Sequence, residues 1–158
     1  MIELRAATFS DIAELMPRLR PMDQFEAHAM SGGLHPAHAI QQSVSMSCYV
    51  RAGVIDGHCE ALWGLTEVSP AWGSYQPWMV MSDWAERNPF TFMRLSKRYI
   101  DEVFTQANYL SNYVHTTNEF SQRWLRRIGF TVDEQETIVN GHPWYQFHWE
   151  RQANVHYE

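Results

Sequence analysis

Apolar and polar positions follow two different rhythms along this chain, and the change of rhythm predicts where helices and strands lie. Apolar residues recur every three or four positions in SDIAELMPRL and in the long segment after Pro89, as expected for helices with one buried face. The opening MIELRAA alternates residue by residue, which is typical of an edge strand, and Trp78–Ser82 is an apolar run suited to a central strand. The run CYVRAGVIDGHCEALWGLTEV predicts two strands joined by a turn at Asp56 and Gly57. The chain is therefore expected to combine helices with a sheet.

Capping and breaking residues limit the first helices. Thr8 and Asp11 fit a capping box, and Pro17 predicts a kink or an early end of the helix that follows. Two further helices are expected at Met22–Met30, before a glycine pair, and at Pro36–Met46, with proline in the first position. The N-terminal part of the chain is thus predicted to be mostly helical.

The second half of the chain continues the alternation. Asp83–Asn88 predicts a polar turn, a long helix starts at Pro89, and LSNYVHT predicts a strand. A helix after Asn118 and a hairpin around Asn140 and Gly141 complete the pattern. The order predicts an α/β (α+β) fold with a mixed, mostly antiparallel sheet of six or seven strands and helices on both faces. Since no linker or repeat interrupts it, residues 1–158 are expected to form a single domain.

Composition and charge exclude several classes of protein. A chain of 158 residues can bury a core without disulfides or metals, and its net charge of -6 disfavours nucleic acid and anionic membranes as partners. No run approaches the roughly 20 apolar residues of a membrane helix, and the start does not resemble a secretory signal. Cys48 and Cys59 are expected to be buried as small apolar residues rather than paired. These features predict a soluble protein of a reducing cytoplasm, as a monomer or homodimer.

The stretch NEFSQRWLRRIGF carries the most specific pattern. Asn118 stands where it can cap a helix, Gly129 can end that helix in a left-handed conformation, and Phe130 can anchor the next segment in the core. With Ser121, and with the opening IELRAAT, this pattern resembles the GNAT superfamily of N-acyltransferases. Within it the chain is most similar to small GNAT-like proteins of short-tailed bacteriophages, described as acetyltransferase-like or as internal virion proteins. This resemblance implies a location in the host bacterial cytoplasm or in the virion.

The resemblance also implies a chemistry and a set of site residues. A GNAT enzyme binds acetyl-CoA where its fourth and fifth strands separate, and transfers the acetyl group to an amine, on a small molecule or a host protein. The cofactor-binding residues implied here are Met79, Met81, Ser82, Arg87, Asn88, Phe90, Thr91, Asn118 and Ser121. For the base that deprotonates the amine, Glu67 is the first candidate, ahead of Glu60 and Asp83. For the acid that protonates the leaving thiolate, the candidates are Tyr113 and His115 on the strand before Asn118, of which Tyr113 is preferred. No zinc-like spacing of histidine and cysteine is present, so no metal is expected.

Two departures from the family pattern favour an alternative. The loop expected to hold the CoA pyrophosphate contains no glycine, carries Asp83 and Glu86, and includes Pro89, which has no N–H to donate. Leu125 stands where GNAT enzymes often have the proton-donating tyrosine. The alternative is a non-catalytic GNAT-like phage protein that binds and modulates a host protein or is packaged in the virion. On that alternative Asn88 merely starts a structural helix, and Glu67 is a solvated strand residue.

Overall fold

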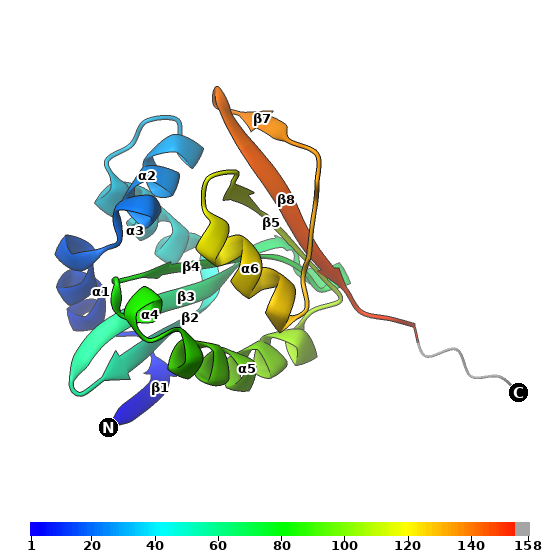
Figure 1. Ribbon diagram of the computed structural model, residues 1–158. Helices are drawn as coiled ribbons and strands as arrows, with labels where there is room; N and C mark the ends of the chain where they lie inside the picture. Colours follow the sequence, from blue (N-terminus) through cyan, green and yellow to red (C-terminus); the bar gives the residue numbers. More distant parts are fainter. Residues whose placement is uncertain (154–158) are drawn as a thin grey trace, which may run out of the picture.

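The computed structural model describes residues 1–153, which form one eight-stranded sheet with helices packed on both faces (Figure 1). The strands are β1 (Ile2–Ala6), β2 (Ser47–Ile55), β3 (His58–Ser69), β4 (Ser74–Met81), β5 (Tyr109–His115), β6 (Thr131–Val132), β7 (Thr137–Val139) and β8 (His142–Glu150). The helices are α1 (Phe9–Leu15), α2 (Pro21–Met30), α3 (Pro36–Met46), α4 (Trp84–Arg87), α5 (Pro89–Gln106) and α6 (Glu119–Ile128), with short 3-10 helices η1 (Met16–Arg18) and η2 (Pro70–Trp72).

The strands are arranged in the order β1-β2-β3-β4-β5-β8-β6, and β7 pairs with β8. Every neighbouring pair is antiparallel except β4 and β5, which run parallel. The α/β class and the mostly antiparallel sheet are therefore confirmed. β7 and β8 form the hairpin expected around Asn140 and Gly141. The strand count exceeds the expected six or seven because β6, of two residues, is too short to leave an alternating pattern.

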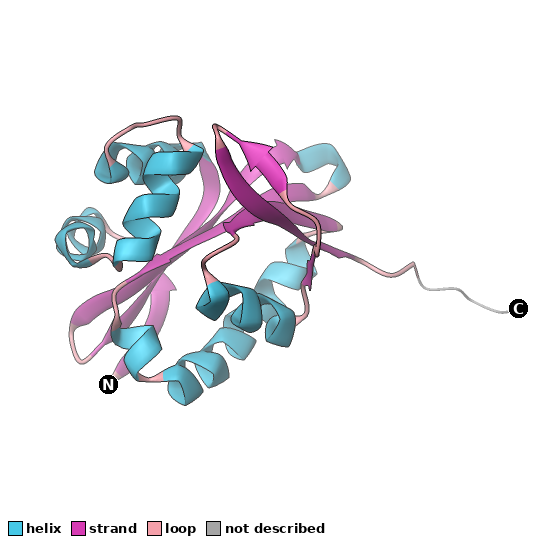
Figure 2. Ribbon diagram, turned by 45° about the horizontal axis from the view of Figure 1, so that its top comes forward, coloured by secondary structure: helices cyan, strands magenta, loops and turns pink. Residues whose placement is uncertain are grey.

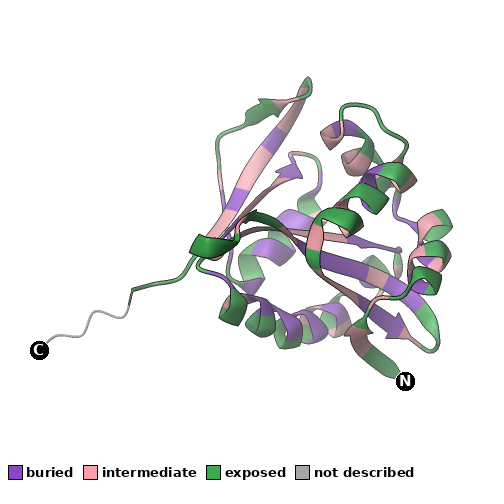
Figure 3. Ribbon diagram, turned by 180° about the vertical axis from the view of Figure 1, so that it is seen from behind, coloured by how far each residue is buried: buried purple, intermediate pink, exposed green. Residues whose placement is uncertain are grey.

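Two apolar clusters hold the helices to the sheet. Leu62 belongs to the cluster under α1 and α3, and its neighbour Trp63 belongs to the cluster under α5 and α6, because successive strand residues point to opposite faces. Figure 2 shows the resulting layers, and Figure 3 shows that the buried residues of α5 face the sheet. No helix among residues 1–153 is long and apolar enough to cross a membrane.

The sheet opens between its two halves, and this opening positions the site. β4 and β5 pair only at their first residues, Ser74 with Tyr109 and Tyr75 with Leu110. Beyond Tyr75 the strands diverge, so the inner edges of both strands lose their ladder partners. Buried backbone groups need hydrogen-bond partners, so these edges must be satisfied by side chains, by solvent or by a ligand.

Local signals in the sequence set several element boundaries correctly. Thr8 and Asp11 form the expected capping box, and the first helix ends at Leu15, where η1 with Pro17 takes over. Gly129 ends α6 with φ of 117°, a left-handed conformation that favours glycine.

Three expectations need correction. Asp83–Asn88 is not simply a polar turn, because Trp84–Arg87 forms α4 and the Ala85 side is buried. β4 begins at Ser74, four residues before the apolar run that predicted it, because the antiparallel pairing of β4 with β3 extends through the polar residues before Trp78. Cys59 is buried as expected, but Cys48 is exposed, since it lies at a register shift between β2 and β3 that turns it out of the alternation.

Candidate active site

A cavity of about 330 Å³ lies where β4 and β5 separate. Its walls come from both faces of the sheet, with α2 and α3 on one side and α5 and α6 on the other (Figure 2). Much of the wall is apolar and includes Met30, Trp63, Met79, Tyr99, Val114 and Trp144. A cavity of this size and polarity is suited to a small organic ligand held by a few polar groups.

The inner edge of β4 carries free backbone groups at Met79. In the antiparallel ladder, the backbone groups of even-numbered β4 residues bond to β3. The same pattern continues just beyond the strand, where the N–H of Ser82 donates to the C=O of Glu60. The backbone groups of odd-numbered β4 residues therefore point toward β5. The C=O of Pro77 accepts a hydrogen bond of 2.9 Å from Nδ2 of Asn112 on β5. Within residues 1–153 the N–H and C=O of Met79, the next residue on this edge, have no protein partner. A ligand in the cavity can therefore pair with Met79.

Glu26 on α2 lines the cavity and bonds to the end of β5 and to the start of α6. Its Oε2 accepts a hydrogen bond of 3.0 Å from the backbone N–H of His115, and its Oε1 accepts one from Nδ2 of Asn118. Burial raises the pKa of Glu26 to about 7, with a smaller contribution in the same direction from the charge of Asp23, although the two hydrogen bonds oppose this rise. A carboxyl group that titrates near neutral pH at a cavity wall can both bind an ammonium group and accept its proton.

Arg20, at the start of α2, forms a second polar cluster at the far end of the splayed edge. Its side chain is 2% exposed and makes two hydrogen bonds to Asp23, of 2.6 and 3.1 Å. It also donates to Oε1 of Glu86 at 2.8 Å and to Oγ of Ser121 at 3.3 Å. The same residues close the β4 edge at Met81, whose N–H donates to Asp23 at 2.8 Å and whose C=O accepts from the Arg20 N–H at 2.9 Å.

Burial and pairing act in opposite directions on the Arg20 guanidinium. Desolvation alone would lower the pKa of Arg20, but the carboxylates of Asp23 and Glu86 outweigh it and raise the pKa above its ordinary value. The guanidinium is therefore a permanent positive charge inside the protein.

The structure brings some of the residues expected from the sequence together and leaves others apart. Those that line the cavity are Met79, Met81, Tyr113, Asn118 and Ser121. Asn118 also caps α6, as its Oδ1 accepts from the Ser121 N–H at 3.2 Å. Glu67 is exposed on β3, opposite Tyr75, and is not part of the cavity wall. Leu125, at the position expected for an acid, is buried in the wall.

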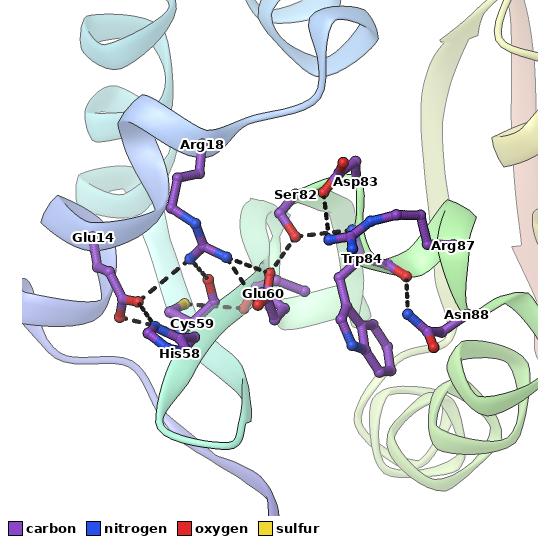
Figure 4. Close-up of polar contacts among 11 residues, drawn as sticks. Glu14, Arg18, His58, Cys59, Glu60, Ser82, Asp83, Trp84, Arg87 and Asn88 are labelled. Atoms are coloured by element: carbon purple, nitrogen blue, oxygen red, sulfur yellow. Dashed lines mark hydrogen bonds and ion pairs between the residues drawn. The ribbon is translucent and has the colours of Figure 1, made fainter.

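Hydrogen bonds within the segment after β4, and from it to β3, hold this segment in place (Figure 4). The Ser82 hydroxyl donates to Glu60, which Arg18 holds with two hydrogen bonds of 2.8 Å, and the same hydroxyl accepts from the Trp84 N–H. Ser82 is fully buried and lies outside the cavity wall.

The residues expected to hold a pyrophosphate follow this segment. Arg87 pairs with Asp83 at 3.0 Å, and Nδ2 of Asn88 donates to the Trp84 C=O at 2.9 Å (Figure 4). Phe90 is 87% exposed and Thr91 is half-buried, and both lie in the first turn of α5. None of the four lines the cavity.

Sequence reasoning missed Arg20 and Glu26, which carry most of the charge at the site. A weak signal was present, because Asp23 and Glu26 are three residues apart in a predicted helix and so share one face. Their partners are distant in sequence: Glu26 meets Asn118, and Arg20 meets Ser121, 101 residues away. No local pattern reports such contacts.

Comparisons with known proteins support the fold and no closer relationship. No model of a known protein family matches the chain, and no curated protein matches it. Among solved structures, it is similar to the Vibrio cholerae spermidine N-acetyltransferase bound to CoA and spermine, with 14% identity, a TM-score of 0.65 and coverage of 94% of this chain and 95% of that one. An aminoglycoside acetyltransferase bound to coenzyme A gives 12% identity, a TM-score of 0.66 and coverage of 96% and 95%. The Escherichia coli ribosomal-protein-S18-alanine N-acetyltransferase gives 11% identity, a TM-score of 0.66 and full coverage of both chains. The chain has the fold of the GNAT acetyltransferases.

Proposed function

We propose that this protein is an N-acyltransferase that transfers an acyl group from CoA to an amine bound in the cavity between β4 and β5. The observation that carries the proposal is Glu26, a carboxyl group with a pKa of about 7 at the wall of a largely apolar cavity. The fold supports it, since the solved structures of this fold include enzymes that act on amines and bind CoA. The acceptor would be a primary amine, either on a small molecule or on a host protein.

Glu26 would bind the amine and take its proton. Each carboxylate oxygen can accept a second hydrogen bond beyond those from His115 and Asn118, so an ammonium group can be bound without displacing either donor. Transfer of the proton to Glu26 leaves a neutral amine, which is the nucleophilic form. The apolar wall keeps the pKa of Glu26 high enough for this transfer near neutral pH.

CoA would supply the acyl group as a thioester, and the inner end of the cavity fits that part of it. The free N–H of Met79 can donate to an acyl oxygen or to an amide of the CoA arm. The hydroxyl of Tyr113, in the same wall, is the O–H proposed to donate a proton to the leaving sulfur. For the phosphates, the first turn of the 18-residue α5 offers the N–H groups of Phe90 and Thr91, with Arg87 nearby in sequence.

The experiment that tests the proposal measures thiol release from acetyl-CoA with a panel of primary amines, from diamines and polyamines to an N-terminal peptide. We expect turnover whose kcat/KM rises as pH increases through about 7, where Glu26 loses its proton. Glu26→Gln should reduce kcat by about 100-fold or more, the range typical of a lost general base. Glu67→Gln tests the base expected from the sequence in the same assay. A profile unchanged in Glu26→Gln would refute the assignment.

A second candidate is the non-catalytic GNAT-like phage protein that binds a host protein or belongs to the virion. Two observations favour it: Leu125 replaces the usual acid, and Met81, on the edge where the CoA arm would pair, already bonds to Arg20 and Asp23. Calorimetry with acetyl-CoA and CoA separates the two candidates. Binding of either ligand together with thiol release supports the transferase, whereas no binding at near-millimolar ligand together with no thiol release supports the second.

A further inference from the structure

Arg20 stands at the meeting point of three elements that a CoA arm would have to touch. The GNAT resemblance takes the arm along β4 to Met81, past the first turn of α6 at Ser121, and on to the segment before α5. Arg20 reaches all three. Its backbone N–H bonds to the C=O of Met81, and its guanidinium bonds to Ser121 and to Glu86 on α4. The same guanidinium pairs with Asp23, which accepts from the N–H of Met81. A ligand that touched these three elements at once would need the space that the Arg20 side chain fills.

The Arg20 side chain is held there firmly. Its two hydrogen bonds to buried Asp23 have the bidentate geometry that favours guanidinium–carboxylate pairs, and its guanidinium carbon lies 5.6 Å from the centre of the Phe120 ring, over the ring face. The bond to Glu86 is the accessible part of the cluster, since that side chain is 46% exposed. Glu86 can therefore release Arg20 at little cost, whereas separation of Arg20 from Asp23 would leave buried charges unpaired.

We propose that the Arg20 side chain is a stopper in the path of the CoA arm, held by Asp23 and Glu86, and that acyl-CoA enters only when the guanidinium moves away from Ser121 and from Asp23, the residue that binds the N–H of Met81. This inference rests on the proposed function, because it assumes that CoA is the donor. Its consequence is that the free protein has a low affinity for CoA. A ligand that requires a minor conformation binds with an apparent affinity reduced by the population of that conformation.

The test is calorimetry with CoA on matched double variants. Arg20→Ala with Asp23→Ala removes the stopper and both buried charges together, and it also frees the N–H of Met81. Arg18→Ala with Glu60→Ala is the control, because it removes another arginine–carboxylate pair, in which Nη2 of Arg18 donates to both oxygens of Glu60 (Figure 4). Neither residue lines the cavity wall. Urea unfolding of each protein shows that it is folded.

A second pair of variants uses only exposed positions, in case the first variant does not fold. Glu86→Ala removes the accessible partner of Arg20, and Asp83→Ala removes a carboxylate of the same charge one residue before the same helix. The comparison separates release of Arg20 from a general gain in attraction for phosphate.

If Arg20 is the stopper and is in place more than nine-tenths of the time, Arg20→Ala with Asp23→Ala binds CoA at least about tenfold more tightly than the wild type. Glu86→Ala then shifts the affinity in the same direction and by more than Asp83→Ala, and the Arg18 and Glu60 control stays at the wild-type value. If the wild type, the Arg20→Ala with Asp23→Ala variant and the Glu86→Ala variant all bind CoA with equal affinity, the stopper is overturned. If the wild type in that case acetylates amines, the proposed function stands. Binding in none of the proteins overturns both.

Discussion

The titration of Glu26 gives a prediction that is independent of any substrate. Burial raises the pKa of this group from 4.5 to about 7 in the folded protein, while the unfolded chain keeps the ordinary value. Between these two values the folded protein holds a proton that the unfolded chain has lost. The contribution of Glu26 to stability is therefore fully present below pH 4.5, and is lost as the pH rises through about 7.

The size of this loss follows from the interval between the two pKa values. At about 1.4 kcal/mol for each pH unit, the interval from 4.5 to about 7 corresponds to a loss of about 3 kcal/mol in the free energy of unfolding. The amide that replaces the carboxyl group in the Glu26→Gln variant does not titrate, so this contribution is absent there. The variant also faces two donors, from His115 and Asn118, with only one acceptor oxygen, which costs about 1–3 kcal/mol at every pH.

The assay is urea unfolding of wild type and Glu26→Gln at pH 4, 5, 6, 7 and 8. Shifts from other titrating groups are common to both proteins and cancel in the difference. Between pH 4 and pH 8 we expect the free energy of unfolding of Glu26→Gln to rise by about 3 kcal/mol relative to that of the wild type. Glu26→Gln should therefore be less stable than the wild type in acid, and equally or more stable at pH 8. A difference that stays constant with pH would show that Glu26 titrates as an ordinary exposed carboxyl and would remove the basis for its role as a base.

Three further predictions concern the scaffold of the site. Asn118→Ala removes the cap of α6 and a donor to Glu26, so it should cost about 1–2 kcal/mol in urea unfolding and move the midpoint of the activity profile to higher pH; a midpoint at the wild-type pH would contradict it. Gly64→Ala places a Cβ 2.7 Å from the Tyr49 carbonyl oxygen and 2.8 Å from the Trp78 ring. We expect either a loss of soluble folded protein or a decrease of at least about 2 kcal/mol in the free energy of unfolding. A decrease of no more than about 1 kcal/mol would show that the strands move apart to accommodate the methyl group. Gly129→Ala leaves the nearest neighbour at 3.5 Å, so only its left-handed backbone should matter, at about 1 kcal/mol in the same measurement.

Local chemistry explains how much of the fold could be predicted. The capping box of Thr8 and Asp11 and the left-handed Gly129 act within a few residues, and each ended or began a helix where expected. α4 was missed because a helix of four residues is shorter than a hydrophobic period can reveal. The separation of β4 from β5 was expected only through the family resemblance, since nothing in either strand encodes a partner that is lost after two residues.

The site was predicted less well because its charges come from α2. The resemblance implied Met79 and Asn118, and the strand before α6 offered Tyr113; all three line the cavity. GNAT enzymes often carry the base on a strand, which favoured Glu67 over any residue of α2. Burial decides which carboxyl group titrates near neutral pH, and burial depends on contacts that the sequence does not display.

The position of α2 joins the two halves of the proposed site. Pro21 starts the helix, so Arg20 and Asp23 lie in its first turn beside Met81 on β4, and Glu26 lies one turn later beside His115 on β5. One helix thus contacts both edges of the opened sheet, at Met81 through the Arg20–Asp23 ion pair and at His115 through the carboxyl group of Glu26. A shift of α2 that moved Arg20 away from Met81 would also change the hydrogen bonds and the burial of Glu26. If the Arg20 stopper opens by movement of the whole helix, CoA binding should therefore change the pKa of Glu26, and protonation of Glu26 should change the affinity for CoA by the same factor.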